Sequence, residues 1–182
     1  MKNLVLIFAA LLIINCTASA QTYMTKNGKI SFFSKTDIEN IDAVNNQTMS
    51  VLNTQNGEIV FSLMVNSFLF KKALMQEHFN ENYMESGKYP KATFKGTITD
   101  LSKVNFKKDG TYNVSVTGDL TMHNVTNKVT VPAVIQVKAG KLSAAATFNA
   151  KLDDYKISVP KVVENNISKT IEVKIDCNYE AR

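Results

Sequence analysis

The sequence predicts a mainly β protein: one eight-stranded antiparallel barrel with a single helix laid across one opening. Three observations support this prediction. Most of the chain alternates apolar and polar residues with period two, which is typical of half-buried strands. Turn signals such as Asn56-Gly57 and Asp109-Gly110 separate the alternating runs. The runs 111–123, 127–138 and 141–152 are about twice the usual strand length, and long antiparallel strands lose their exposed edges when a sheet closes into a barrel.

The expected strands follow one another along the chain, and most are joined by short turns. The first alternation begins at Ile30 and Phe32, and the next follows the Asn56-Gly57 turn. Residues 153–168 break the alternation and predict a long loop that crosses one end of the barrel. Counting the runs gives about eight strands. The alternating positions that define seven of them fall in 30–32, 59–65, 92–98, 114–122, 129–137, 142–152 and 171–179.

One segment changes from period two to helical spacing. Between residues 68 and 86, Met75, Phe79 and Tyr83 recur every four residues, with polar side chains on much of the other face. This spacing predicts a helix of about four turns that ends before Gly87. Because the helix has one apolar face, we expect it to cover the open mouth of the barrel.

The composition is that of an ordinary globular domain. The chain has 182 residues, of which 45% are apolar and 20% charged, and its formal net charge is +5. These values argue against a disordered chain and against a membrane protein with many spans, and the length fits one domain. The positive charges are spread along the chain, so we expect no nucleic-acid partner. Two cysteines are too few for a disulfide-stapled scaffold.

The first twenty residues have the pattern of a signal peptide. Lys2 precedes an uncharged apolar run over residues 4–14, which is shorter than the roughly 20 residues needed to span a bilayer. Ala18-Ser19-Ala20 supplies the small residues of a cleavage site. We therefore expect residues 1–20 to be a cleaved signal peptide, residues 21–182 to be the mature barrel domain, and the protein to be periplasmic or secreted.

Cys16 offers an alternative N-terminus. It follows the apolar run, as a lipid-modified cysteine does, and acylation there would tether the mature protein to a membrane. Asn15 stands at the preceding position, where lipoprotein signals usually have a small residue. The Ala18-Ser19-Ala20 site is the better match of the two.

Small residues share the inward phase of the strands with aromatic ones. Gly96, Gly118 and Ala146 occupy the same alternating positions as Phe94 and Phe148, so all five are expected to point to the same side of the sheet. An eight-stranded barrel can be filled by side chains or hold one small ligand, so a hollow lumen and a solid core both remain open. A hollow lumen would take an apolar guest. The candidate ligand-binding residues are Phe61, Leu63, Phe94, Val116, Leu120, Ile135, Ala144, Ala146 and Phe148 in the wall, and Phe68, Leu74, Met75 and Phe79 in the lid.

Residues for catalysis or metal binding are few. His78 and His123 are the only histidines, and with Cys177 as the single cysteine of the mature chain they make a poor zinc-ligand set. Ser86 lies eight residues from His78, about 12 Å along one helix, so the two cannot pair directly. We expect no catalytic site, no metal and no cofactor. An enzyme of unknown type would instead place His78 or His123 in a cleft with a carboxylate.

Two stretches resemble the motifs of the YceI-like family. The first comprises His78-Phe79, Tyr83-Met84-Glu85-Ser86 and residues 89–96; the second is residues 116–129. Asn124 stands where the family usually has glycine, and the Arg-x-Asp-Phe-Gly-type motif of the family is only partly kept in residues 151–157. The resemblance implies an exported protein with a lipocalin-like barrel, and some members bind a polyisoprenoid chain inside it.

The combined expectation is an exported lipid-binding protein. Its partner would be a long-chain isoprenoid or other lipid in an apolar barrel cavity, with transient membrane contact possible. The alternative is a ligand-free structural or interaction barrel of the cell envelope. The interior volume distinguishes them, because ligand pockets are rarely below about 300 Å³.

Overall fold

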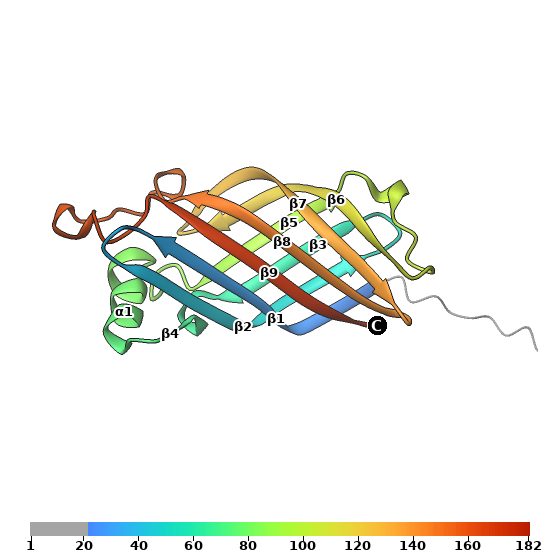
Figure 1. The fold of residues 1–182 in the computed structure, drawn as a ribbon, viewed down its shortest axis with the longest axis horizontal. Helices are drawn as coiled ribbons and strands as arrows, with labels where there is room; N and C mark the ends of the chain where they lie inside the picture. Colours follow the sequence, from blue (N-terminus) through green and yellow to red (C-terminus); the bar gives the residue numbers. More distant parts are fainter. Residues whose placement is uncertain (1–21) are drawn as a thin grey trace, which may run out of the picture.

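The structure is a computed structural model that describes residues 22–182, and their strands form one antiparallel sheet. The strand order is β1-β9-β8-β7-β6-β5-β3-β2-β4, and β1 also pairs with β2, which closes the sheet into a barrel (Figure 1). Eight strands form the wall, whereas the two-residue strand β4 (Leu69–Phe70) pairs with Ala43 and Val44 near the start of β2. The predicted eight-stranded barrel is therefore confirmed.

The wall strands are long and are joined largely by tight turns. Two of these turns, His123-Asn124 and Ala139-Gly140, have positive φ at both residues, as type I′ hairpins require. Asparagine tolerates this left-handed backbone, which explains how Asn124 occupies a usual glycine position. The wall comprises β1 (Thr22–Lys35), β2 (Asn40–Asn53), β3 (Glu58–Met64), β5 (Lys91–Ile98), β6 (Gly110–Met122), β7 (Val125–Lys138), β8 (Lys141–Lys151) and β9 (Thr170–Ala181).

Strand β2 was missing from the predicted set because its inward face is polar. Asn45, Thr48 and Ser50 are fully buried. The buried positions change from odd to even numbers between Asn45 and Thr48, where the β1–β2 pairing carries register shifts. A bulge of this kind moves the inward-facing side chains from odd to even positions, so no single apolar–polar alternation runs through the strand. Ser50 Oγ and the Tyr179 hydroxyl lie 2.7 Å apart and share a hydrogen bond.

The helix is shorter than predicted. α1 (Ala73–His78) continues into a π-helical turn over Phe79–Tyr83, so the predicted start at residue 68 is wrong. The chain before α1 forms a 3₁₀ turn (Val65–Ser67) and then β4 (Leu69–Phe70), which pairs with β2. The helix ends three residues earlier than expected, and Glu85 then takes a left-handed backbone with φ of 43°.

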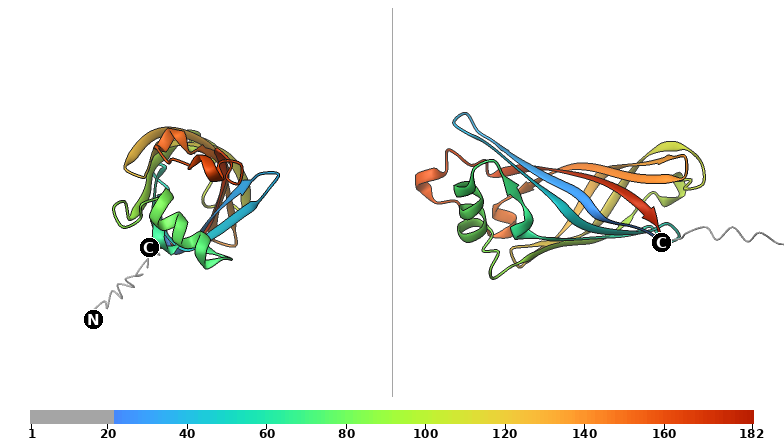
Figure 2. Two further views of the ribbon diagram at one scale, coloured as in Figure 1. Left: turned by 90° about the vertical axis from the view of Figure 1, so that its left-hand side faces the viewer. Right: turned by 90° about the horizontal axis from the view of Figure 1, so that it is seen from below.

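The two ends of the barrel differ. The filled end is closed by large side chains, including Leu52, Ile135 and Tyr179, and by the 99–109 connection, which contributes Leu101 and Phe106. The mouth end is formed by the β1–β2 turn, residues 65–84 and residues 152–169. Figure 2 (left) looks into the mouth end, with the helix across its lower part. No helix within residues 22–182 is long and apolar enough to cross a membrane.

The segment predicted as a loop, residues 153–168, lies at the mouth end, the same end of the barrel as the helix (Figure 1). It contains two 3₁₀ turns, Asp153–Tyr155 and Lys161–Val163. Tyr155 and Ile157 are buried against the apolar cluster at the mouth. The segment is therefore partly packed into the barrel end and is not a free loop.

Candidate functional site

An apolar cavity of about 440 Å³ lies inside the mouth end. Its wall comes from the inward faces of β1, β3, β5, β6, β8 and β9, because alternate side chains on these strands point into the lumen. Among the predicted wall residues, the cavity is lined by Leu63, Leu120 and Phe148. Among the predicted lid residues, it is lined by Phe68, Leu74, Met75 and Phe79. Their role in ligand binding stays a prediction.

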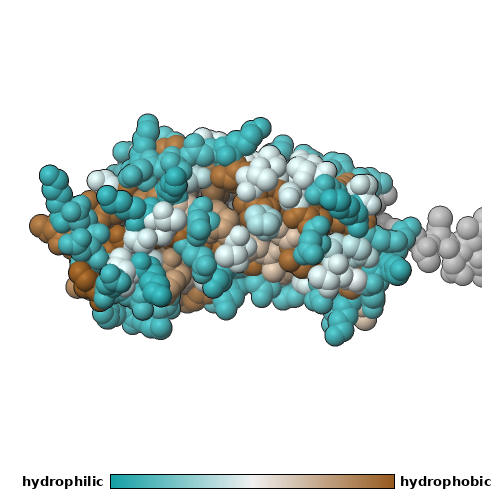
Figure 3. Space-filling view, turned by 45° about the horizontal axis from the view of Figure 1, so that its top comes forward, coloured by the Kyte–Doolittle hydropathy of each residue, from teal (hydrophilic) through white to brown (hydrophobic). Residues whose placement is uncertain are grey.

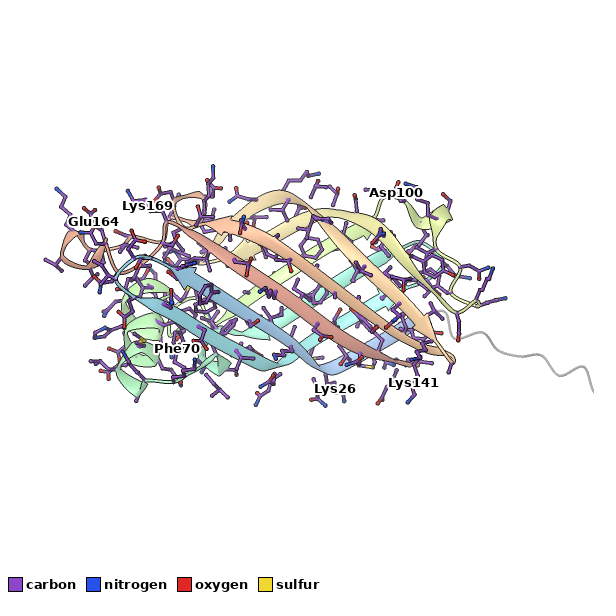
Figure 4. All side chains as sticks on the ribbon, in the orientation of Figure 1. Lys26, Phe70, Asp100, Lys141, Glu164 and Lys169 are labelled. Atoms are coloured by element: carbon purple, nitrogen blue, oxygen red, sulfur yellow. The ribbon has the colours of Figure 1, made fainter. Side chains whose placement is uncertain are left out.

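Four phenylalanine rings gather at the lid. Phe79 at the start of the π-helical turn contacts the rings of Phe32, Phe68 and Phe70 at centroid distances of 5.4, 5.6 and 5.0 Å. Phe32 and Phe70 were not among the predicted site residues, although both line the cavity. The signal for Phe70 was the short alternation Phe68-Leu69-Phe70, which was assigned to the helix. Figure 4 labels Phe70 near α1 at the mouth end, far from Asp100 and Lys141.

A second, smaller cavity of about 80 Å³ is also lined by apolar residues alone. Leu120 and Phe148 line both cavities. The other predicted wall residues around the smaller cavity are Phe61, Phe94, Val116, Ala144 and Ala146. Ile135, in contrast, lines neither cavity: it is 2% exposed and packs into the core of the filled end.

The glycines in the wall do not leave empty space. Gly96 and Gly118 pair across β5 and β6. A Cβ atom on Gly96 would lie 2.5 Å from Cζ of Phe94, and one on Gly118 would lie 2.7 Å from the same atom. The ring of Phe94 therefore rests on the glycine pair, and the room predicted there is occupied by that ring.

Polar residues from three separate segments meet at the rim of the mouth. Glu39 of the β1–β2 turn accepts a hydrogen bond from Lys72 Nζ at 3.1 Å, just before α1, and one from Asn166 Nδ2 at 3.5 Å. Hydrogen bonding by Lys72 and then Asn166 lowers the pKa of the Glu39 carboxyl. Such exposed contacts contribute little to stability. Inside the rim, burial raises the pKa of the Tyr83 hydroxyl.

His123 connects the β6–β7 turn to two other segments. Its Nδ1 lies 3.0 Å from the Tyr155 carbonyl oxygen, and its Nε2 lies 2.9 Å from Oε2 of Glu85. Both partners are acceptors, so a ring with protons on both nitrogens donates to each of them. The ring of Tyr89 packs edge-on against it at a centroid distance of 4.9 Å. The motif residues thus tie together the helix end, the hairpin and the 152–169 segment.

Within residues 22–182, no three or more His, Cys, Asp or Glu side chains are grouped as metal ligands would be. His123 does meet a carboxylate, which was the expected sign of an enzyme, but both of its ring nitrogens are engaged. A general base needs a free nitrogen within reach of a substrate proton. His78 lines the main cavity as an exposed side chain and shares that cavity with the carboxylate of Glu39, so it too meets the expected sign.

These features define a class: closed antiparallel barrels whose lumen is part core and part apolar cavity, an architecture that includes the lipocalins. A family model described as the YceI-like domain matches residues 17–179. The chain therefore belongs to the YceI-like family, and the family resemblance of its two motifs is confirmed. A search among curated proteins found no match.

Solved structures with the same fold come from several bacteria. One is a polyisoprenoid binding domain from Saccharophagus degradans, with a TM-score of 0.78 at 16% identity over 90% of this chain and 100% of that one. Another is BcnA from Burkholderia cenocepacia, with a TM-score of 0.68 at 17% identity over 84% and 96%. A third is the YceI protein of Campylobacter jejuni, with a TM-score of 0.59 at 16% identity over 77% of this chain and 85% of that one. At these identities the likeness establishes the fold alone.

Replacing His123 with alanine should lower the free energy of unfolding by about 1–3 kcal/mol, because it leaves the buried Tyr155 carbonyl without its partner. Urea denaturation of residues 21–182 measures the change. His78→Ala is the matched control, since that side chain is exposed, and it should stay within about 0.5 kcal/mol of the parent. Equal losses in the two variants would contradict a structural role for His123.

Proposed function

We propose that the protein binds a polyisoprenoid or similar amphiphile, with the apolar chain of the ligand inside the cavity at the mouth end. The observation that carries this proposal is an interior volume of about 440 Å³ with almost wholly apolar walls. That volume lies within the range of ligand pockets, roughly 300–1,000 Å³. It favours a carrier over the ligand-free structural barrel, whose lumen would be filled by side chains.

Two further observations favour a long apolar chain as the ligand. The Saccharophagus degradans structure with the same fold is described as a polyisoprenoid binding domain. The polar groups at the mouth gather at the rim, where Glu39, Lys72 and Asn166 meet, and not at the depth of Leu120 and Phe148. A ligand with an apolar chain and a polar end suits this arrangement, since each buried methylene contributes about 0.8 kcal/mol.

The proposed role is binding without catalysis. His123 uses both nitrogens in structural contacts. Of the acid and base side chains that line the main cavity, Glu39 is engaged by Lys72 and Asn166 at the rim and His78 is exposed, whereas the smaller cavity is lined by apolar residues alone. A hydrolase or transferase would need such a group beside the bound chain. The paired contacts of His123 therefore support a carrier and not an enzyme.

Filling the main cavity tests the proposal directly. Ala150 is buried and lines the cavity, so Ala150→Phe should reduce the affinity for a long-chain polyprenol at least about tenfold by occupying its space. Asn149→Phe, the neighbouring outward-facing position on β8, should bind as the parent does. Native mass spectrometry with added polyprenol reports retention by each folded variant. Equal retention by both variants, or none by the parent, would reject the proposal.

Export is proposed on the N-terminal pattern, whose residues lie outside the described part of the chain. The cleaved protein would begin at Gln21 and act in the periplasm or the medium. Mass spectrometry of the mature N-terminus after expression in a Gram-negative host provides the test. A start at Gln21, with or without cyclisation to pyroglutamate, agrees with cleavage after Ala20; an acylated Cys16 identifies a lipoprotein, and an intact Met1 argues against export.

We also propose that the mouth end touches a membrane when the ligand enters or leaves. Exposed apolar side chains sit on all three segments of the mouth: Ile38 at 65% exposure, Leu74 at 60% and Val162 at 91%. Figure 3 shows apolar side chains at the surface of this end, on its left-hand side. Leu74 also lines the cavity, so the exposed apolar surface is continuous with the interior. Apolar side chains around a lipid cavity suit the headgroup–acyl boundary of a bilayer.

Replacing Ile38, Leu74 and Val162 together with serine should reduce binding to phosphatidylethanolamine–phosphatidylglycerol vesicles at least about tenfold, because three partly inserted side chains lose their apolar contact. Co-sedimentation measures the bound fraction. Met49, Val60 and Val134 are exposed apolar residues on the barrel wall, and their replacement with serine is the control. Equal reduction in the two triple variants would reject the mouth as the contact surface.

A further inference from the structure

We propose that Leu120 and Phe148 form a partition across the lumen, which stops an entering apolar chain and so selects ligands by chain length. The inference rests on the proposed function and adds a limit on the ligand. It starts from one observation: these two side chains line both the cavity of about 440 Å³ and the cavity of about 80 Å³. The two spaces therefore share one wall, made of Leu120 on β6 and Phe148 on β8.

The smaller cavity lies between the partition and the filled end. Of its lining residues, Ile59, Val116 and Ala144 belong to the packed core of the filled end. Beyond them the lumen is closed by fully buried side chains such as Leu52. A chain that enters at the mouth would therefore meet the partition first, the small space second and a dense core last.

The far side of the small cavity is held in place by the backbone. Phe94 rests on Gly96 and Gly118, where no Cβ atom fits beside its ring. Phe61 lies next to it, with 6.2 Å between the ring centroids. The positions of both rings are thus set by the β3, β5 and β6 walls, and the small cavity keeps its volume.

Leu120 is the partner of Phe94 across β5 and β6, but both partition residues border empty space. Leu120 and Phe148 are both only partly buried, and each faces empty space on two sides. An interior packed to ordinary density would surround such side chains completely. Their bulk alone separates the two spaces, so removing it should join the spaces into one deeper pocket. This arrangement therefore discriminates between ligands by the length of the apolar chain and not by the chemistry of the headgroup.

The test measures affinity for a series of all-trans polyprenols that differ by one isoprene unit. For the parent, affinity should rise with length until the main cavity is full and then level off. In Leu120→Ala/Phe148→Ala the plateau should begin at least one unit later. The first unit beyond the parent's limit should bind at least about tenfold more tightly, because its carbons enter the opened space.

Two controls separate the partition from a general change in cavity size. Phe79→Ala enlarges the main cavity at the lid without touching the partition, so it should alter affinity and leave the small cavity closed. Leu142→Ala removes the same atoms as Leu120→Ala, but at the filled end, where the residue lines neither cavity. A plateau that shifts by the same number of units in Leu142→Ala would overturn the proposal.

Ala133→Val keeps the test decisive if the double variant fails to fold. Ala133 lines the small cavity and not the main one, and it is not among the predicted ligand-binding residues, so two added methyl groups there should leave all affinities of the parent unchanged. If Ala133→Val weakens parent binding of the longer chains, those chains already pass the partition and the proposal is wrong. A parent that binds no polyprenol of any length rejects the proposed function; a parent that binds with the same plateau as the double variant rejects the partition alone.

Discussion

Pairing of β1 with β2 closes the sheet, and the interior of the molecule depends on that closure. Without it the sheet would have free edges at β1 and at the β2–β4 side, and its apolar face would be open to water. With it, eight strands enclose a lumen only wide enough for side chains or one slender guest. The closing pair carries two register shifts and a polar inward face, so the seam of the barrel is its least regular part.

The lumen is narrow, so the size of the inward-facing side chains determines whether a given part of it is filled or contains a cavity. At the filled end, large residues from seven strands meet Leu101 and Phe106 from the 99–109 connection. Toward the mouth, Ala92 and Ala150 take the inward positions of β5 and β8, and the 152–169 segment packs Tyr155 and Ile157 against the barrel end. Small residues at these inward positions contribute to the room for the cavity.

The alternating strands were predictable because their inward residues are apolar throughout, as in β6 and β9. The same rule hid β2, where Asn45, Thr48 and Ser50 are buried. Asn45 accepts a hydrogen bond from the Gln47 N–H, and Ser50 bonds Tyr179 across the barrel. The lid was predicted as one helix from residue 68, because apolar residues at 68 and 70 fit the pattern of a helix as well as that of a strand. In the structure Phe70 pairs with Ala43 of β2, so this segment is a strand. Periodicity reports which face of a segment is buried, but not which partner buries it.

The same limit applies to the cavity. The sequence placed Gly96, Gly118 and Ala146 on the inward phase, but it could not say which of them border empty space. Phe94 lies on the same strand as Gly96, and its ring covers both Gly96 and Gly118. Ala146, in contrast, does border a void. A small residue creates room only if no neighbouring side chain reaches over it, and that depends on rotamers and strand register.

The contacts that hold the mouth segments differ from one side to the other. On one side, the segment before the helix meets the β1–β2 hairpin through exposed pairs, Lys71–Asp42 at 2.9 Å and Lys72–Glu39 at 3.1 Å, which contribute little to stability. On the other side, His123 is largely buried and bonds both Glu85 and the Tyr155 carbonyl, and a lost buried partner costs about 1–3 kcal/mol. The ring contacts of Phe79 with Phe32 and Phe70 are the main link on the weaker side, and they are themselves part of the cavity lining. An apolar guest that replaced those contacts with its own would open the lid there at little cost, because the apolar surface of the rings would stay covered.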